Sequence, residues 1–176
     1  MRKNEMVMDY NKLNNEILKA YSKGDRNKEN IMIGIHENDN SFNDILISFN
    51  GHNLYVVPDC FFPFDVAAIT EGYLNNHITL NNNLYKCISG ENEYDYYRVG
   101  YDYTKYLDKC GKKLECSIFK CGDSFKIGVN AGFLKYFNLD NCIIKAKSSK
   151  SPLMIYDKND RLLALILPIN FNQEEL

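Results

Sequence analysis

The clearest pattern along the chain is a pair of apolar runs on either side of an Asn-Gly dipeptide. Residues 45–49 (ILISF) and 54–57 (LYVV) flank Asn50 and Gly51. Asn-Gly favours a type I′ turn, because both central residues of that turn adopt positive φ. This stretch therefore predicts a β-hairpin. Pro58 and Pro63 cannot donate to a ladder, so an edge strand or loop is expected over 61–66.

Apolar residues at helical spacing predict a helix over residues 9–23, near the start of the chain. Leu13 and Ile17 recur on one face, Asp9 is placed to cap the first turn, and Gly24 supplies a stop. Alternating isoleucines after this helix predict a strand near residue 31.

The second half of the chain repeats this order of elements. Runs at 114–119 and 124–129 predict a hairpin around Cys121-Gly122-Asp123, and residues 131–138 read as a short helix. Strands are then expected near residues 142, 152 and 162. A helix followed by three strands thus occurs twice, which indicates an internal duplication. No linker rich in Pro, Gly or Ser divides residues 1–176, so we expect a single domain with an irregular insertion around 70–104.

The last third of the chain, residues 125–170, carries a resemblance to a known family. The residues concerned are Asn130, Phe133, Leu134, then Ser151, Pro152, Leu153, Met154, Ile155, then Leu165, Ile166, Leu167, Pro168 and Ile169. In this order they resemble the carboxy-terminal domain of bacterial DNA polymerase sliding clamps. The resemblance implies an α+β fold of two β-α-β-β-β halves, with helices packed on curved antiparallel sheet. At 176 residues the chain is too short for the three domains of a clamp subunit, so a ring would be a homo-oligomer of more copies.

The resemblance also implies a binding pocket at the end of the chain. In clamps the carboxy-terminal hydrophobic segment helps to line the pocket that receives peptides from polymerases and repair proteins. The residues that would lie near it here are Ser151, Pro152, Leu165, Ile166, Leu167 and Pro168. The alternative is that they form a core strand and its exit. The family pattern ends near this point, whereas here a polar, acidic tail follows over 170–176.

Charge is distributed unevenly along the chain. The formal net charge is −2, but residues 105–150 hold ten lysines and four acids, a net of +6, which leaves −8 for the remainder. A solvated lysine-rich face is one explanation. The other is sequence-independent contact with the phosphates of duplex DNA, through counterion release. The candidate DNA-binding residues are Lys105, Lys109, Lys112, Lys113, Lys120, Lys145, Lys147 and Lys150.

An acidic, tyrosine-rich run over residues 91–98 is a second candidate surface. Tyr94, Asp95, Tyr96 and Tyr97 either belong to a strand and loop with half-buried rings or bind a protein partner, because tyrosine supplies contact area at low entropic cost. Acid-flanked aromatics could also mimic nucleic acid toward a basic partner.

The sequence displays no recognisable catalytic motif, so we expect a protein that is not an enzyme and needs no cofactor. The six cysteines include no C-x-x-C pair, which argues for reduced thiols and against a metal site. The chain starts Met-Arg-Lys-Asn-Glu without an apolar signal core, and no run is long enough to span a membrane. A cytoplasmic protein is expected.

Two functions remain open on the sequence. The leading one is a non-enzymatic, clamp-like protein of a phage or mobile element that acts on DNA or on a DNA-processing complex. The alternative is an inhibitor of a host defence nuclease, like an anti-CRISPR protein, which acts by binding to a nucleic-acid-processing complex.

Overall fold

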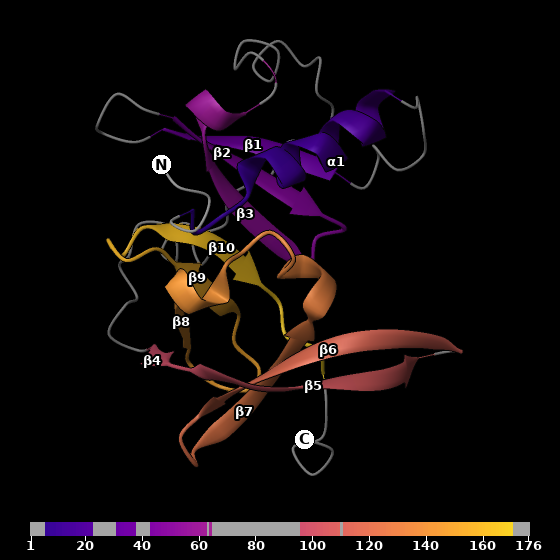
Figure 1. The fold of residues 1–176 in the computed structure, drawn as a ribbon, viewed down its shortest axis with the longest axis vertical. Coiled ribbons are helices and arrows are strands. Elements are labelled where there is room, and N and C mark those ends of the chain that lie inside the picture. Colours follow the sequence, from indigo (N-terminus) through magenta and orange to yellow (C-terminus); the bar gives the residue numbers. More distant parts are fainter. Residues whose placement is uncertain are drawn as a thin grey trace.

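The computed structural model describes residues 6–22, 31–37, 43–62, 64, 96–109 and 111–170. These residues form one α-helix and ten antiparallel strands in two sheets (Figure 1). The strands of the larger sheet are β1 (Ile31–Glu37), β2 (Asn43–Phe49), β3 (Asn53–Pro58), β4 (Tyr97–Arg98), β8 (Ile143–Ala146), β9 (Leu153–Tyr156) and β10 (Leu162–Ile166). The strands of the smaller sheet are β5 (Gly100–Lys109), β6 (Lys112–Cys121) and β7 (Phe125–Asn130).

The first hairpin and the first helix agree with the sequence. Asn50 and Gly51 have φ of 57° and 70°, so both take the positive φ that a type I′ turn needs, and they join β2 to β3. Helix α1 (Tyr10–Ser22) begins after Asp9, whose Oδ1 accepts the Lys12 N–H at 3.0 Å. This contact is the N-cap that the sequence predicts.

The second predicted helix, over residues 131–138, is wrong. The chain instead makes two 3-10 turns, η4 (Ala131–Phe133) and η5 (Leu139–Asn141). The Tyr136 carbonyl accepts from Asp9 N–H at 2.7 Å, and Asn138 N–H donates to the Val7 carbonyl at 2.9 Å. In an α-helix over 131–138 the Asn138 N–H would instead donate to the Leu134 carbonyl. Pairing with the N-terminal segment therefore outweighs local helix formation.

A side-chain contact reinforces this link between the N-terminal segment and the 3-10 turns. The Glu16 carboxylate on α1 accepts hydrogen bonds from Lys135 Nζ and Tyr136 Oη. Partial burial disfavours the charged carboxylate, but these hydrogen bonds outweigh burial and hold the pKa of Glu16 below its ordinary value.

The strand order of the larger sheet is β1-β2-β3-β10-β9-β8-β4, with β4 as an edge strand beside β8. Two three-stranded units, β1-β2-β3 and β8-β9-β10, meet where β3 pairs with β10. The direct partners there are Asn53 with Ile166, Leu54 with Leu165, and Tyr55 with Ala164. The three-strand part of the predicted duplication is therefore present as two meanders, one after α1 and one after the 3-10 turns, while the second helix is absent. This arrangement does not establish the clamp-like part of the prediction, two β-α-β-β-β halves with helices packed on curved sheet.

Both faces of the larger sheet carry buried apolar side chains. On one face Tyr55, Val57, Ile155 and Ile166 join the main core, which also includes Leu13 and Ile17 of α1. On the opposite face a second cluster gathers Leu46, Leu54, Val56, Met154, Tyr156, Leu162 and Leu165. This accounts for the near-continuous apolar runs of β3, β9 and β10, since a strand buried on both sides shows no alternation.

The smaller sheet contains the second predicted hairpin, formed by β6 and β7 around a turn at residues 122–124. It also contains β5, a ten-residue strand whose first half, residues 100–104, was predicted to belong to the irregular insertion. The insertion was expected over 70–104, of which residues 70–95 lie outside the described part. The segment after β10 ties the sheets together, because Leu167 N–H donates to the His52 carbonyl and Ile169 N–H to the Gly128 carbonyl.

An edge strand or loop was predicted over residues 61–66. β3 ends at Pro58 and is followed by a 3-10 turn, η2 (Asp59–Phe61); Pro63 and residues 65–66 lie outside the described residues.

Four of the cysteines, Cys60, Cys116, Cys121 and Cys142, are free, while Cys87 and Cys110 are not described. Burial raises the pKa of the Cys142 thiol to about 12. No helix in the described ranges is long and apolar enough to cross a membrane.

Tyr55 provides a test of the packing between the two units. Its fully buried ring packs edge-on against Tyr136, and its hydroxyl donates to the Phe133 carbonyl at 2.8 Å. We expect Tyr55→Phe to cost about 1–2 kcal/mol, because a part-buried carbonyl loses its donor. Tyr55→Ala should cost about 3–5 kcal/mol through the cavity it leaves. Urea unfolding measures both, with Tyr106→Phe, at an exposed position, as the matched control. A Tyr55→Phe variant as stable as this control would contradict the assignment.

Candidate nucleic-acid interface

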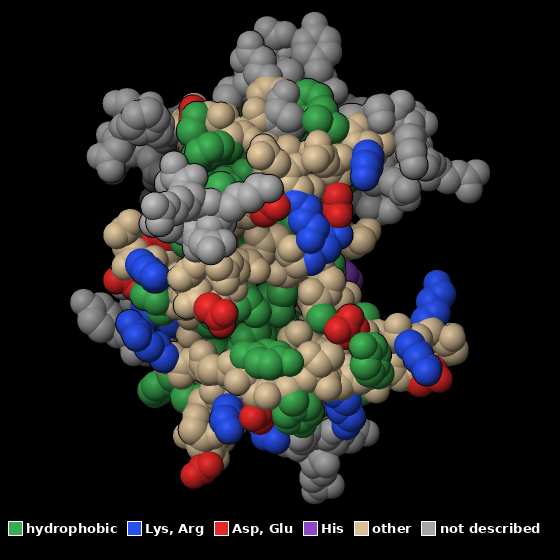
Figure 2. Space-filling model, in the orientation of Figure 1, with side chains coloured by type: hydrophobic (Ala, Val, Ile, Leu, Met, Phe, Trp, Pro, Cys, Tyr) green, Lys and Arg blue, Asp and Glu red, His purple; other side chains and the backbone are tan. Residues whose placement is uncertain are grey.

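The predicted DNA-binding lysines fall into separate groups in the structure. Lys105, Lys109, Lys112 and Lys113 belong to the β5–β6 hairpin, which ends at the turn near Gly111. Lys112 and Lys113 are exposed and Lys105 is half-buried, while the side chain of Lys109 is outside the described set. Lys145, Lys147 and Lys150 lie on β8 and in the turn that follows it. Figure 2 shows basic side chains on both flanks, over the hairpin tip and over β4 and β8.

In the β8 group, the Lys145 side chain and the Lys147 backbone make local contacts. Lys145 Nζ lies 3.6 Å from the Asp160 carboxylate and 4.6 Å from the centre of the Tyr156 ring, and its side chain is only 15% exposed. Lys147 N–H donates to Ser151 Oγ at 2.9 Å in the turn before β9. The eight predicted lysines therefore come from two parts of the fold, β5 and β6 with their hairpin, and β8 with the turn that follows it.

At the base of the hairpin the structure brings Lys120 together with a lysine that the sequence list omits. Lys120 and Lys126 are direct partners in the β6–β7 ladder. Asp102 Oδ1 lies 3.2 Å from Lys120 Nζ, and Asp102 Oδ2 lies 3.9 Å from Lys126 Nζ. Lys126 Nζ also lies 5.2 Å from the centre of the Tyr103 ring, a cation–π contact. We call Asp102, Tyr103, Lys120 and Lys126 the Asp102 cluster.

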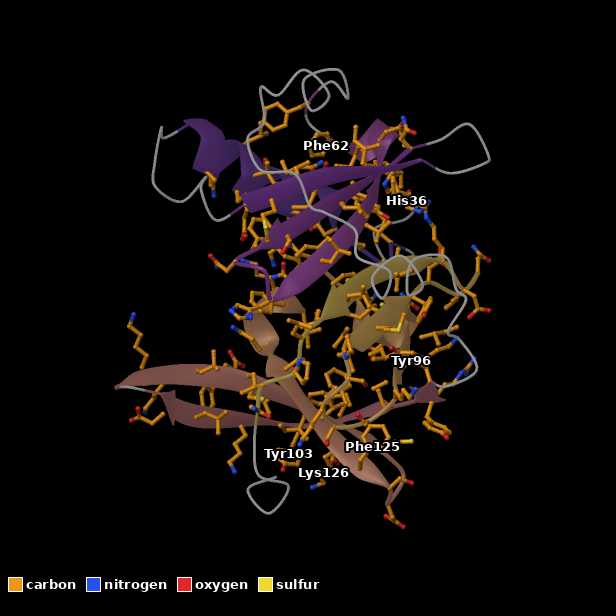
Figure 3. The ribbon with its side chains drawn as sticks, turned by 180° about the vertical axis from the view of Figure 1, so that it is seen from behind. His36, Phe62, Tyr96, Tyr103, Phe125 and Lys126 are labelled. Atoms are coloured by element: carbon orange, nitrogen blue, oxygen red, sulfur yellow. The ribbon has the colours of Figure 1, made fainter. Side chains whose placement is uncertain are left out.

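An open hollow of about 420 Å³ lies beside the Asp102 cluster. The β6–β7 turn closes one side of it. Figure 3 shows Tyr103, Phe125 and Lys126 near one another at this end of the smaller sheet. The residues lining the hollow are Asp102, Lys120, Gly122, Asp123, Ser124, Phe125 and Lys126.

The register of the smaller sheet sorts its charges by side. Residues that pair directly in an antiparallel ladder share a side, and sides alternate along each strand. The pairs Lys105 with Cys116 and Lys109 with Lys112 therefore lie on the same side as Lys120 and Lys126. Asp108, Lys113 and Glu115 alternate to the other side. We call the side that carries Lys105, Lys109, Lys112, Lys120 and Lys126 the lysine side.

The residues assigned to a clamp-like pocket meet at the shared end of β9 and β10. Leu153 pairs with Ile166, so Pro152 and Leu167 are the next residues on the two strands. Leu165 is only 5% exposed and belongs to the second cluster, whereas Leu167 is 44% exposed. Pro168 is half-buried.

The Ser151 hydroxyl makes hydrogen bonds within the turn between β8 and β9. Its Oγ accepts the N–H groups of Lys147 and Ser148 at 2.9 and 3.0 Å and lies 3.0 Å from the Ser148 carbonyl, to which it can donate. This side chain therefore stabilises the turn between β8 and β9.

Two of the four candidates in the acidic tyrosine run are described. Tyr96 is half-buried against the second apolar cluster, and Tyr97 on the edge strand β4 is 58% exposed. Tyr94 and Asp95 lie outside the described residues. Tyr101 and Tyr106 of β5, which the sequence reading did not single out, are 53% and 65% exposed.

The part of the chain that the structure describes has no group of three or more His, Cys, Asp or Glu side chains placed to hold a metal ion. Comparisons with family models, with curated proteins and with solved structures give no match for this chain. The resemblance to sliding clamps stays a prediction carried by the sequence.

Alanine substitutions along the end of β10 test the placement of the pocket candidates. Leu165→Ala and Ile166→Ala should each cost about 2–5 kcal/mol, since both side chains are buried, on opposite faces. Leu167→Ala should change stability by less than about 0.5 kcal/mol. Thermal melts of the three variants measure the differences. A stable Leu165→Ala variant would contradict burial at that position and return Leu165 to the candidates for an accessible pocket.

Proposed function

We propose that this chain is a non-enzymatic, clamp-like protein of a phage or mobile element that associates with duplex DNA through the lysine side of its smaller sheet. The two three-stranded units of the larger sheet support the clamp-like part of the proposal, because the resemblance implies an internally duplicated α+β domain. The DNA-binding part rests on the charges of β5, β6 and β7.

The segregation of charge between the two sides of the smaller sheet carries the proposal. The lysine side bears five lysines; among the described residues Asp102 forms ion pairs with two of them, and Asp123 lies in the lining of the adjoining hollow. The opposite side places Asp108 and Glu115 beside Lys113. Lys112 and Lys120 lie roughly 26 Å apart along β6, at about 3.3 Å per residue, with the buried Cys116 and Ile118 on the same side between them. B-DNA presents one phosphate per ~1.7 Å of its axis, so one duplex offers partners to the lysines at each end of this side.

The contact should be made to the backbone of the DNA and not to its bases. Lysine ammonium groups neutralise phosphates without reading sequence, and their binding is driven by the release of counterions. We therefore infer weak, non-specific binding that decreases steeply as salt is raised.

Charge reversal in the hairpin tests this function. Lys105→Glu with Lys112→Glu should lower the affinity for a short labelled duplex by at least about tenfold and reduce the slope of log K against log salt by about 1.8, at roughly 0.9 per phosphate contact. Fluorescence anisotropy across a salt series measures both quantities. The matched control is Lys19→Glu with Lys158→Glu, which changes net charge equally on α1 and in the β9–β10 turn. Equal losses in the two double variants, or binding that does not depend on salt, would contradict the proposal.

A second candidate function is inhibition of a defence nuclease, and the exposed tyrosines favour it. Tyr97, Tyr101 and Tyr106 present large amphipathic rings on β4 and β5, of the kind enriched at protein interfaces. Under this function, Tyr97→Ala with Tyr106→Ala should abolish inhibition of DNA cleavage by a Cas nuclease complex while duplex binding and the melting temperature stay unchanged. A double variant that inhibits as well as the original protein would exclude these rings as the interface.

A further inference from the structure

The β5 strand carries an extra residue where the Asp102 cluster forms. Tyr101 pairs with Phe119 and Tyr103 pairs with Ile118, so Asp102 has no partner of its own in the ladder. A bulge of this kind re-aims the side chain of its extra residue. Here it directs the Asp102 carboxylate onto two lysines of the neighbouring strands, and the carboxylate is only 22% exposed.

The two lysines form an electrostatically unfavourable pair without an anion between them. Lys120 and Lys126 are directly opposite in the β6–β7 ladder, and like charges at such positions repel each other. Asp102 relieves the repulsion with one oxygen for each ammonium group. A phosphate group offers the same arrangement, with separate oxygens for two lysines and a larger negative charge.

The adjoining hollow has room for such a group. At about 420 Å³ it lies in the range of small-ligand sites, and the Ser124 side chain adds a hydroxyl to its lining. Two of its lining residues, Lys120 and Lys126, are the members of the lysine side farthest from the hairpin tip.

We propose that this hollow is a phosphate-binding subsite for the DNA backbone, and that Asp102 acts as an internal competitor that holds Lys120 and Lys126 until a phosphate replaces it. The inference rests on the proposed function and adds a regulation of the same surface. In the unbound protein Asp102 limits the number of lysines available to DNA.

Removal of the Asp102 charge should therefore strengthen binding. Asp102→Asn preserves the size of the side chain and removes its ion pairs with the two lysines, so that the salt slope should increase by about 0.9 to 1.8. At 0.1 M salt the duplex affinity should increase by about eightfold for each freed lysine, which follows from the same slope. The matched control is Asp123→Asn, which removes an equal charge from the lining of the same hollow without releasing the lysine pair.

A second set of variants shows whether the gain depends on the two lysines. Adding Lys120→Gln and Lys126→Gln to Asp102→Asn should erase the gain. In the otherwise unchanged protein the same lysine changes should weaken binding less than the hairpin variant does, because Asp102 already masks these lysines. This comparison remains informative if Asp102→Asn alone folds poorly, which thermal melts would reveal.

Four results would overturn the inference. The first is an unchanged or lower duplex affinity in folded Asp102→Asn, and the second is an equal gain of duplex affinity in Asp123→Asn. The third is complete loss of duplex binding when Lys120 and Lys126 are changed in the otherwise unchanged protein. The fourth is binding of inorganic phosphate by Asp102→Asn without any gain in duplex affinity. The last would assign the hollow to small phosphates. If the hairpin variant weakens DNA binding as expected while Asp102→Asn brings no gain, the subsite fails and the proposed function stands.

Discussion

The pairing of β3 with β10 is the contact on which the rest of the fold depends. It joins two three-stranded units that are separated by about a hundred residues of sequence, and it places Tyr55 opposite the small side chain of Ala164. That pairing makes room for the Tyr55 ring beneath Tyr136 and the 3-10 turns. Arg161, just before β10, donates to the buried Asp44 of β2 and links the same two units.

The smaller sheet takes its position from this central pairing. β7 leads into the 3-10 turns that pack on the main core, and the segment after β10 returns to hydrogen-bond with Gly128 of β7. Both of these attachments are made by β7, one edge strand of the smaller sheet. Its hairpin projects from that base (Figure 1), so the lysine side is presented by a strand pair whose base is fixed.

Local chemistry made part of this structure predictable. The Asn50-Gly51 turn, the Asp9 cap and the three late strands follow from propensities that act within a few residues. The prediction of a second helix was wrong because the Asn138 N–H pairs with the Val7 carbonyl, a contact between distant segments, and not within its own segment. Lys126 was missed for a related reason. Its place beside Lys120 depends on strand register, and the reach of Asp102 depends on a bulge that no local signal in the β5 sequence marks.

The most direct test of the account is a map of the surface that duplex DNA contacts. Backbone amide shifts of ¹⁵N-labelled protein, titrated with a short duplex at low salt, would provide it. We expect the perturbed amides to lie in β5, β6 and β7 and to be largest near Lys105, Lys112, Lys120 and Lys126. Perturbations concentrated at the end of β9 and β10, around Pro152 and Leu167, or an absence of any shift at low salt, would contradict the lysine side as the DNA-binding surface.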